Sequence, residues 1–556
     1  MKRLLFEIHR WVGVVLALFM LLWFFSGLVI VFTGQLSLSR NAQLAHAESL
    51  SPETGWLSLG EAWDRSADAR KAAARAESTG RGSEDHRNGE RGSEERSKEG
   101  KAGNGRGKGA GGNTIVEARL LRQSDKPVWL VEDGRNRRFA ISALDGKLHE
   151  VTEDEALEIA TRWLAHENKS NVELKYLDTI DSSSSLRNQQ SLRPFHRIAV
   201  KDGAGTELLI SARSGEVLQA ASRLDRALYY AGNWLHLFRP LDAIGWGEAR
   251  RDILTWLGFF AFAGALTGMI VGWLRWRPGW FGKHTYSEGR TQPYRAFWFK
   301  WHFWSGLLGG TLAVLWAFSG YLDNNPFKLF SEGNTSREEL SKFIGPDVPP
   351  AMRHWKPAPL ADESADVVEL KWRRLGDQSV LIASTRDGQR LPQETEGSVK
   401  KFDNATLQTA VNRLANGAPI SRTVVLNEYD DYYYLRHHRD AAEKPLPVVR
   451  VELGDAVATH YYIDPQDGRL LLKRDRSSRA MRWLYSAIHH WDFGWLYKRP
   501  FWDIWMVIWV SFGLVLSLTA VVVGWKRLLL TFRPAKRKLP RKAESIPALA
   551  TENQAN

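Results

Sequence analysis

The sequence predicts a membrane α-helical bundle of four transmembrane helices, built as a tandem repeat of two pairs, with two α+β segments outside the membrane. The first observation is a set of four apolar blocks of 20 or more residues, the length that a helix needs to cross a hydrocarbon core about 30 Å thick. The second is a set of seven identities between the first and third blocks. The third is a recurrent strand–turn–strand pattern between the blocks.

The four apolar blocks lie at 11–32, 253–273, 303–322 and 501–525 of the 556 residues. Mean hydropathy over the whole chain is −0.35, so the spans are visible only in local windows. The first block follows basic residues, as in a signal peptide. It is longer than the 7–15 apolar residues of a signal peptide, and no small-residue cleavage site follows Phe32. We therefore expect an uncleaved helix.

These blocks divide the chain into alternating membrane and extramembrane parts. We expect transmembrane helices at 1–33, 251–275, 301–322 and 501–526, outer segments at 34–222 and 323–478, interfacial amphipathic segments at 223–250 and 479–500, a cytoplasmic loop at 276–300 and a basic tail at 527–556.

The net charge of +13 is concentrated beside the spans, in the loop at 276–300 and in the tail after residue 525. By the positive-inside rule, these parts are cytoplasmic. Both termini then lie inside, and the two long segments lie outside. Basic residues at a membrane surface contact anionic lipid, so membrane lipid accounts for the charge and we expect no nucleic-acid partner.

The outer segments combine short helices with short strands. Thr152 and Glu155 form a capping box ahead of an apolar helical face, which predicts a helix over 153–166. Strand–turn–strand signals recur at 139–148, 208–218, 380–391 and 461–471, each with Asp-Gly or Ser-Gly in the turn. These patterns predict four hairpins.

Residues 78–113 contain no large apolar side chain. Such a segment buries too little surface to offset its chain entropy, so we expect a disordered insertion within the first outer segment. It includes a formal G-x-G-x-x-G at 107–112, but no apolar strand precedes these glycines. We therefore reject a dinucleotide site there.

A capped helix followed by strands with Asp-Gly or Ser-Gly turns resembles the PepSY domain. Four spans interrupted by two such segments resemble the PepSY-associated transmembrane family, and the resemblance covers nearly the whole chain except 78–113 and the ends. Within that family, the architecture is most similar to inner-membrane ferric-siderophore reductases, which carry haem b held by histidines. The resemblance implies a multi-pass protein of the bacterial inner membrane with PepSY-like outer segments.

The strongest signal in the chain is a repeat between the first and third spans. At a constant offset of 293, His9, Trp11, Gly13, Trp23, Phe25, Ser26 and Gly27 match His302, Trp304, Gly306, Trp316, Phe318, Ser319 and Gly320. The second and fourth spans correspond more weakly, with His236 against His489. Parallel repeats of this kind form a bundle around a pseudo-twofold axis. Gly13 and Gly306 lack a side chain and so leave space on the helix face of each histidine. We expect Ser26-Gly27 and Ser319-Gly320 to allow close helix approach.

The repeat places histidines in two pairs. We expect His9 and His302 to hold one metal centre at the cytoplasmic side, and His236 and His489 to hold another at the outer side, with His490 as an alternative to His489. The competing interpretation is that each histidine is an interfacial side chain beside a belt of Trp residues. The repeated context favours the ligand interpretation.

The expected cofactor is haem b, two per chain, with the iron held by His9, His302, His236 and His489. The chain has no cysteine, which excludes covalent c-type attachment. Arg10 is a candidate partner for the haem propionates. The segment at 428–439 alternates acidic, aromatic and basic residues on a predicted strand. It suits either a ligand contact or an ordinary sheet edge, and we assign no site residue there.

The predicted function is electron transfer through a dihaem b bundle to a periplasmic acceptor, with a ferric siderophore as the candidate substrate implied by the resemblance. We assign no catalytic residue. No flavin or nicotinamide motif is present, so the donor is a separate cytoplasmic reductase or membrane quinol. The alternative is a non-enzymatic PepSY membrane protein that binds or regulates an envelope protease or other partner. A third interpretation is a metal carrier that uses the same histidines. It is less favoured because the four spans have no intramembrane carboxylates and so offer no obvious ion path.

Overall fold

The computed structural model describes residues 2–73, 115–167, 172–331, 333–360, 366–436, 441–496 and 498–532. The segment predicted to be a disordered insertion, at 78–113, lies outside the described residues, as does nearly all of the basic tail.

In the described part of the chain, four long helices are apolar enough to cross a membrane, as the sequence predicts. They are α1 (Lys2–Phe32), α8 (Arg250–Arg275), α9 (Phe297–Asp323) and α15 (Phe501–Phe532). Each contains 26 or more residues, and a helix of that length spans a bilayer with some tilt. The chain is therefore a multi-pass membrane protein.

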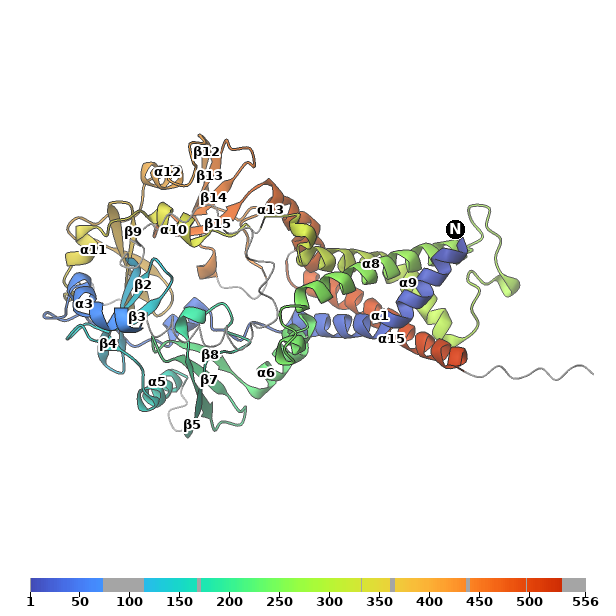
Figure 1. Ribbon diagram of the computed structural model, residues 1–556, viewed down its shortest axis with the longest axis horizontal. Coiled ribbons are helices and arrows are strands. Elements are labelled where there is room, and N and C mark those ends of the chain that lie inside the picture. The colour runs from blue at the N-terminus through green and yellow to red at the C-terminus, as the bar shows by residue number, and fades with distance from the viewer. Residues whose placement is uncertain are drawn as a thin grey trace, which may run out of the picture.

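The four helices form one closed bundle. Helix α1 packs against α8 and α15, and α9 packs against the same two helices. Figure 1 shows the bundle on one side of the molecule and the sheets on the other, with the N-terminus at the bundle end that lies away from the sheets. We call that end the basic end and the opposite end the sheet end.

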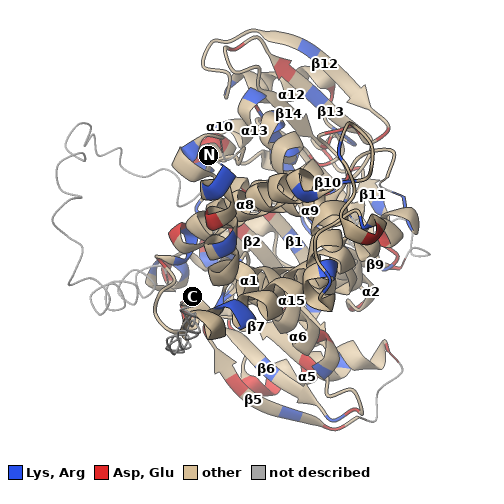
Figure 2. Ribbon diagram, turned by 90° about the vertical axis from the view of Figure 1, so that its right-hand side faces the viewer, with Lys and Arg blue, Asp and Glu red and all other residues tan. Residues whose placement is uncertain are grey.

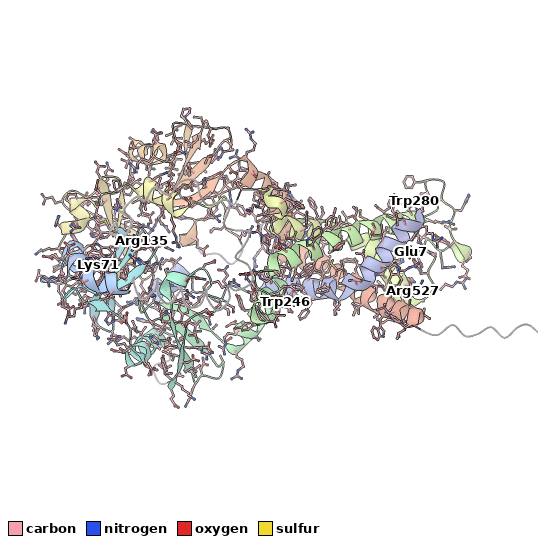
Figure 3. The ribbon with its side chains drawn as sticks, viewed as in Figure 1. Glu7, Lys71, Arg135, Trp246, Trp280 and Arg527 are labelled. Carbon is pink, nitrogen blue, oxygen red and sulfur yellow. The ribbon has the colours of Figure 1, made fainter. Side chains whose placement is uncertain are left out.

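Exposed tryptophans lie at both ends of the bundle, and basic residues gather at one of them. Trp280 and Trp246, with exposed fractions of 62% and 58%, lie at the basic end and at the junction with the sheets respectively (Figure 3). Exposed tryptophans at both ends are typical of membrane interfaces. Figure 2 looks onto the basic end, where Lys and Arg positions surround the N-terminus.

The described residues outside the bundle form three antiparallel sheets together with short helices. The strands are β1 (Ile115–Gln123), β2 (Lys126–Asp133), β3 (Arg138–Ser142), β4 (Leu148–His149), β5 (Leu174–Ile180), β6 (Phe195–Val200), β7 (Glu207–Ser211), β8 (Val217–Ala221), β9 (Val367–Leu375), β10 (Gln378–Thr385), β11 (Arg390–Gln393), β12 (Ile420–Leu426), β13 (Val448–Leu453), β14 (His460–Ile463) and β15 (Leu470–Arg474). Strands β5–β8 form one four-stranded sheet and β12–β15 form another.

The third sheet joins the two outer segments. Its order is β11-β10-β9-β1-β2-β3-β4, so strands from both segments meet at the antiparallel pair β1 and β9. In this pair Arg119 lies opposite Lys371, and Glu117 lies opposite Arg373. Figure 1 shows this sheet between the two four-stranded sheets. The two outer segments therefore share a sheet, which the sequence division into separate segments does not predict.

The four predicted hairpins are confirmed as β3–β4, β7–β8, β10–β11 and β14–β15. Each turn contains a glycine with a positive φ, at Gly146, Gly215, Gly388 and Gly468, a conformation that other residues adopt at a cost. The predicted capped helix is also confirmed as α5 (Glu153–Ala165). Both hydrogen bonds of the Thr152–Glu155 capping box are present.

Each four-stranded sheet is covered by one helix. Helix α5 packs its apolar face on β6 and β7, and α12 (Asn404–Asn412) packs on β13 and β14. The other helices are short: α2 (Arg40–Ala45), α3 (Leu59–Arg65), α6 (Arg223–Tyr229), α7 (Pro240–Ala243), α10 (Arg337–Ile344), α11 (Pro350–His354), α13 (Arg476–Met481) and α14 (Ile488–His490).

The predicted strand at 428–439 is wrong for the part that is described. Strand β12 ends at Leu426, and residues 427–436 form a loop. Asp430 accepts hydrogen bonds from the backbone N–H groups of Tyr432 and Tyr433, which folds the chain into a turn. The local side-chain hydrogen bonds outweigh the strand propensity of the tyrosines.

Candidate functional site: two histidine pairs in the bundle

The first pair lies near the basic end. His9 extends from α1 and His302 from α9, and the centres of their imidazole rings are 6.2 Å apart, with ring planes inclined by 27°. The two helices do not follow one another in the sequence. The fold of the bundle brings these histidines together.

The second pair lies at the sheet end. His236 follows a π-helical turn at Tyr230–Trp234, and His489 follows another at Arg482–Ala487. Their ring centres are 6.3 Å apart, with ring planes inclined by 66°. His236 contacts Ser26, which lies 17 residues beyond His9 on α1. At 1.5 Å per residue, the two pairs are separated by about 25 Å along the helix.

The separation within each pair would leave room for one metal between the two rings. A metal–imidazole bond is about 2.0 Å long, and the ring centre lies about 1.1 Å beyond the nitrogen. Two coaxial imidazoles therefore place their ring centres a little over 6 Å apart. The observed 6.2 and 6.3 Å agree with this value.

Hydrogen bonds fix which ring nitrogen of His9 carries the proton. Its Nδ1 lies 3.1 Å from the backbone carbonyl oxygen of Gly264. A carbonyl oxygen only accepts, so Nδ1 must carry the proton and donate it. Nε2 is then the unprotonated nitrogen, which is the form that binds a metal.

The same tautomer follows for both histidines of the sheet-end pair. Nδ1 of His236 lies 3.0 Å from the Ser26 hydroxyl, and Nδ1 of His489 lies 3.0 Å from the Ser319 hydroxyl. Both hydroxyls already donate to backbone carbonyls one turn earlier, at 2.7 and 2.8 Å. Their remaining role is to accept, so both Nδ1 atoms donate.

The fourth acceptor of a histidine Nδ1 is Thr519, on α15. Its hydroxyl donates to the Val515 carbonyl at 2.8 Å and lies 3.2 Å from Nδ1 of His302. All four histidines therefore have Nδ1 engaged with a helix of the bundle, which makes Nε2 the unprotonated ring nitrogen. A hydrogen bond of this kind holds the ring orientation and raises the basicity of a ligating imidazole.

The local backbone places the sheet-end histidines in corresponding ways. Each π-helical turn leads directly to a histidine, and π-helical turns occur frequently at functional sites. Phe238, two residues after His236, and Trp491, two residues after His489, both adopt the left-handed conformation, with φ of 51° and 54°. The helical conformation thus ends within two residues of each histidine.

Glycines make room for the imidazole rings. A Cβ at Gly27 would lie 3.7 Å from His236, and one at Gly320 would lie 3.5 Å from His489. A Cβ at Gly268 would lie only 2.7 Å from Nδ1 of His9. The Ser-Gly pairs, expected to allow close helix approach, thus lie against the histidines themselves.

The sheet-end histidines are buried outside the spanning helices. Burial lowers the pKa of His236 to about 4 and the pKa of His489 to about 3. Both imidazoles are therefore neutral near pH 7, which is the state that binds metals.

A cavity of about 500 Å³ adjoins the basic-end pair. Apolar residues of α1, α8, α9 and α15 form most of its wall, together with His9 and His302. Four basic residues also line it: Arg10, Arg275, Lys526 and Arg527. Gly13 faces open space here, because a Cβ at this position would meet no described atom within 4 Å. An apolar cavity with basic groups fits haem, which has a flat apolar ring and two carboxylates.

The candidate residues beside these pairs take other positions. His490 lies next to His489, with ring centres 5.3 Å apart, and its Nδ1 contacts the carbonyl oxygen of Ser486. Arg10 forms an ion pair with Glu7 at 2.9 Å. The loop that replaces the expected strand reaches the same region, because Tyr434 donates to Asp492 at 2.6 Å.

The sequence does not identify Gly264, Gly268 and Thr519 as neighbours of the histidines. Gly264 contributes only its backbone carbonyl. Thr519 lies in the fourth span at a position that the sequence repeat does not mark. Ser26 and Ser319 are visible in the repeat, but their hydrogen bonds to histidine require the fold.

Comparison with known proteins agrees with this architecture. No curated protein matches the chain. The family model described as the PepSY-associated TM region matches residues 6–404, which include three of the four bundle helices and His9, His236 and His302. The chain belongs to the PepSY-associated transmembrane family.

Proposed function

We propose that each histidine pair holds one haem b, and that the chain carries electrons across the bacterial inner membrane. The observation that carries this proposal is the shared geometry of the pairs. All four Nδ1 atoms are engaged with the bundle, and the ring centres lie 6.2 Å apart in one pair and 6.3 Å apart in the other, which would leave room for one haem iron between them. An interfacial histidine has no need of a facing partner or of a fixed tautomer.

The separation of the two histidine pairs and the charge at the ends of the bundle give the direction of the proposed electron transfer across the membrane. About 25 Å along a helix is most of a membrane thickness, so the pairs lie near opposite faces. The basic end is cytoplasmic by the positive-inside rule. The sheets then lie in the periplasm, next to the pair His236–His489. The bundle is a tandem repeat of two helix pairs in this proposal.

The residues of the chain have defined roles. His9 and His302 would hold one iron, and His236 and His489 would hold the other. Gly264, Thr519, Ser26 and Ser319 accept from Nδ1 and keep the rings in place. Arg10, Arg275 and Arg527 line the cavity at the basic end and would neutralise the propionates there. Haem with two histidine ligands supplies one-electron transfer and leaves no coordination position for oxygen.

The acceptor in this proposal is a ferric chelate in the periplasm, and a ferric siderophore is the leading candidate. Reduction of Fe(III) to Fe(II) by one electron loosens such a chelate and releases iron for uptake. The donor is a separate cytoplasmic reductase or membrane quinol. The alternative, a PepSY protein that binds an envelope protease without redox activity, leaves the paired geometry of the histidines without a role.

The test is the visible spectrum of the purified full chain from haem-replete cells. We expect a reduced b-type spectrum and two haems per chain that extract into acidic solvent, since no cysteine is present for covalent attachment. In proteoliposomes loaded with a reductant, we expect reduction of an external ferric chelate, measured with a ferrous-specific dye. A colourless protein would reject the electron-transfer function.

A further inference from the structure

One face of the seven-stranded sheet is charged at its centre. Side chains of alternating residues on a strand point to the same face. Ala118, Leu120, Leu370 and Trp372 are buried in the apolar core. The opposite face carries the charged residues: Glu117, Arg119, Glu369, Lys371 and Arg373. Arg119 and Glu369 are only 6% and 2% exposed.

Stability alone does not account for this face. Buried ion pairs are often no more stabilising than apolar residues of the same volume, because both charges lose their hydration. The apolar sides of β1 and β9 show that this sheet readily packs an apolar face. The charged face therefore calls for a role beyond joining the two outer segments.

A cavity of about 380 Å³ lies over the charged face. Seven of its lining side chains are cationic, and two, Glu117 and Glu216, are carboxylates. The cations come from both outer segments: Arg40, Arg119 and Arg138 from the first, and Lys371, Arg373, Arg390 and Arg469 from the second. The described lining side chains thus carry more positive than negative charge, and carboxylates behind the lining offset part of that excess.

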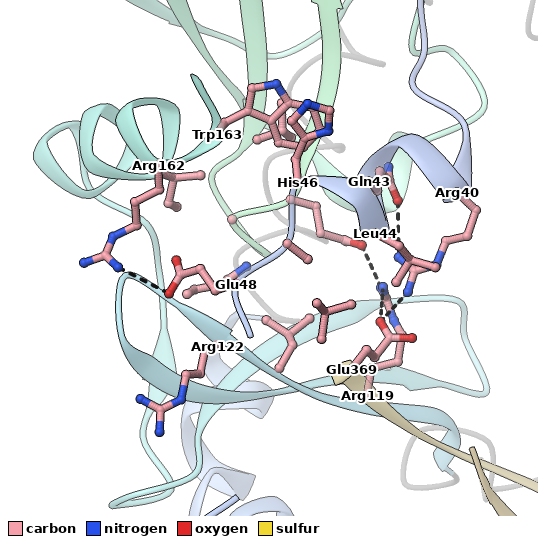
Figure 4. Close-up of a pocket in the computed structure, with 18 residues that line it drawn as sticks. Arg40, Gln43, Leu44, His46, Glu48, Arg119, Arg122, Arg162, Trp163 and Glu369 are labelled. Atoms are coloured by element: carbon pink, nitrogen blue, oxygen red, sulfur yellow. Dashed lines mark hydrogen bonds and ion pairs between the residues drawn. The ribbon is translucent and has the colours of Figure 1, made fainter. Parts of the chain in front are cut away.

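Buried carboxylates hold several of these cations in place. Arg40 and Arg119 converge on Glu369 from α2 and β1 (Figure 4). Arg390 pairs with Asp464 at 2.5 Å, and Lys371 pairs with Asp467 at 3.3 Å. Glu369, Asp464 and Asp467 are almost fully buried and are not part of the lining. The carboxylates lie behind the cations and fix them.

The cations retain capacity for a ligand. Arg373 pairs with Glu117 through one terminal nitrogen at 2.5 Å, and its side chain is still 18% exposed where it lines the cavity. Amide and hydroxyl side chains, including Asn136, Asn188 and Ser191, complete the wall. Arginine forks held in this way recognise planar carboxylates through paired hydrogen bonds.

We propose that this cavity binds a small anion with two or more carboxylate groups, either as the free acid or as its ferric chelate. The cavity volume lies within the range of small-molecule sites. The two lining carboxylates, Glu117 and Glu216, would repel an anion that is smaller and more highly charged than a di- or tricarboxylate. The ligand would contact both outer segments at the point where they share a sheet. The site stands independently of haem binding.

The test is calorimetric titration of the full chain in neutral detergent with citrate, with ferric citrate and with inorganic phosphate. We expect citrate binding that weakens as salt is added, because the contacts are ionic. Binding of the free acid and of the chelate separates the two sources of the ligand. No heat with either citrate form, or binding of phosphate alone, would overturn the proposal.

Variants locate the site. Arg373→Gln and Arg390→Gln should each weaken citrate binding about tenfold or more, since hydrogen bonds to charged groups are the stronger kind. Arg390→Lys keeps the charge and should weaken it less. The matched control is Arg122→Gln, which removes an arginine of β1 that does not line this cavity. Equal affinity in the Arg373, Arg390 and Arg122 variants would contradict the assignment.

Discussion

The hydroxyl of Ser319 lies 3.0 Å from Nδ1 of His489, and it accepts because it already donates to the Leu315 carbonyl. Ser26 makes the same contact with His236. In each case a residue of a spanning helix sets the tautomer of a histidine that lies outside the spans. The bundle is thus coupled by hydrogen bonds to the segments that carry His236 and His489.

Ser319→Ala removes the acceptor of His489 and should weaken haem binding at the sheet-end pair about 10- to 100-fold, the usual effect of losing the outer hydrogen bond of a metal ligand. The basic-end component should not change. Haem loss to apomyoglobin, followed separately for the two spectral components, measures this effect.

Ser305→Ala is the matched control. Ser305 is buried on the same helix, α9, and its hydroxyl donates to the Trp301 carbonyl at 2.7 Å. Equal haem loss in the two serine variants would show that the Ser319 contact does not support the ligand.

Gly268→Ala should selectively disrupt the basic-end pair. A Cβ there would lie 2.7 Å from Nδ1 of His9, which is closer than real Cβ contacts allow. The imidazole must move, so we expect the basic-end haem component to be lost or strongly shifted in the optical spectrum.

Gly272→Ala tests the same helix one turn further on. Its nearest neighbour would be Leu307 at 3.8 Å, an ordinary van der Waals contact. This variant should retain both haem components. If it behaves like Gly268→Ala, the loss reflects the helix α8 and not the position of His9.

Glu216 should make the stability of the outer sheets pH-dependent. Burial opposes its ionisation, but Arg119 and Arg138 outweigh that effect and hold its pKa at about 2. A carboxyl whose pKa is lowered on folding stabilises the fold above its unfolded pKa, near 4.3. That stability, of the order of 3 kcal/mol, should be lost as the pH falls from about 4.5 to 2.

Glu216→Gln should therefore lower the melting temperature at pH 7. The difference from the wild type should narrow as the pH approaches 2, where the native carboxyl is also protonated. Melting curves from tryptophan fluorescence at several pH values measure this. A difference that stays constant with pH would contradict the electrostatic explanation.

Local patterns in the sequence predict much of this fold. Four apolar blocks, the Thr152–Glu155 capping box and four Asp-Gly or Ser-Gly turns all lead to the observed elements, because each depends on residues that are close in sequence. The pairing of β1 with β9 joins residues about 250 positions apart, and no local pattern specifies it. The strand expected at 428–439 is wrong because Asp430 binds the backbone there and turns the chain into a loop.

The histidines are visible in the sequence through the repeat, whereas their surroundings are not. His9 and His302 share a context of rare Trp and Gly residues, so residue identity alone draws attention to them. Gly264 contributes a backbone carbonyl, which any residue has. Its role depends on the packing of α8 against α1, and only the folded bundle shows it.

Optical redox titrations of wild type, His9→Ala, His302→Ala and the double variant test most directly whether His9 and His302 hold one haem. If the two histidines hold one haem, each single variant should lose the same spectral component. The double variant should lose no more than either single, since the residues act as a unit. The component assigned to His236 and His489 should remain in all three. Additive losses, or the loss of different components from the two single variants, would show that His9 and His302 do not share a ligand site.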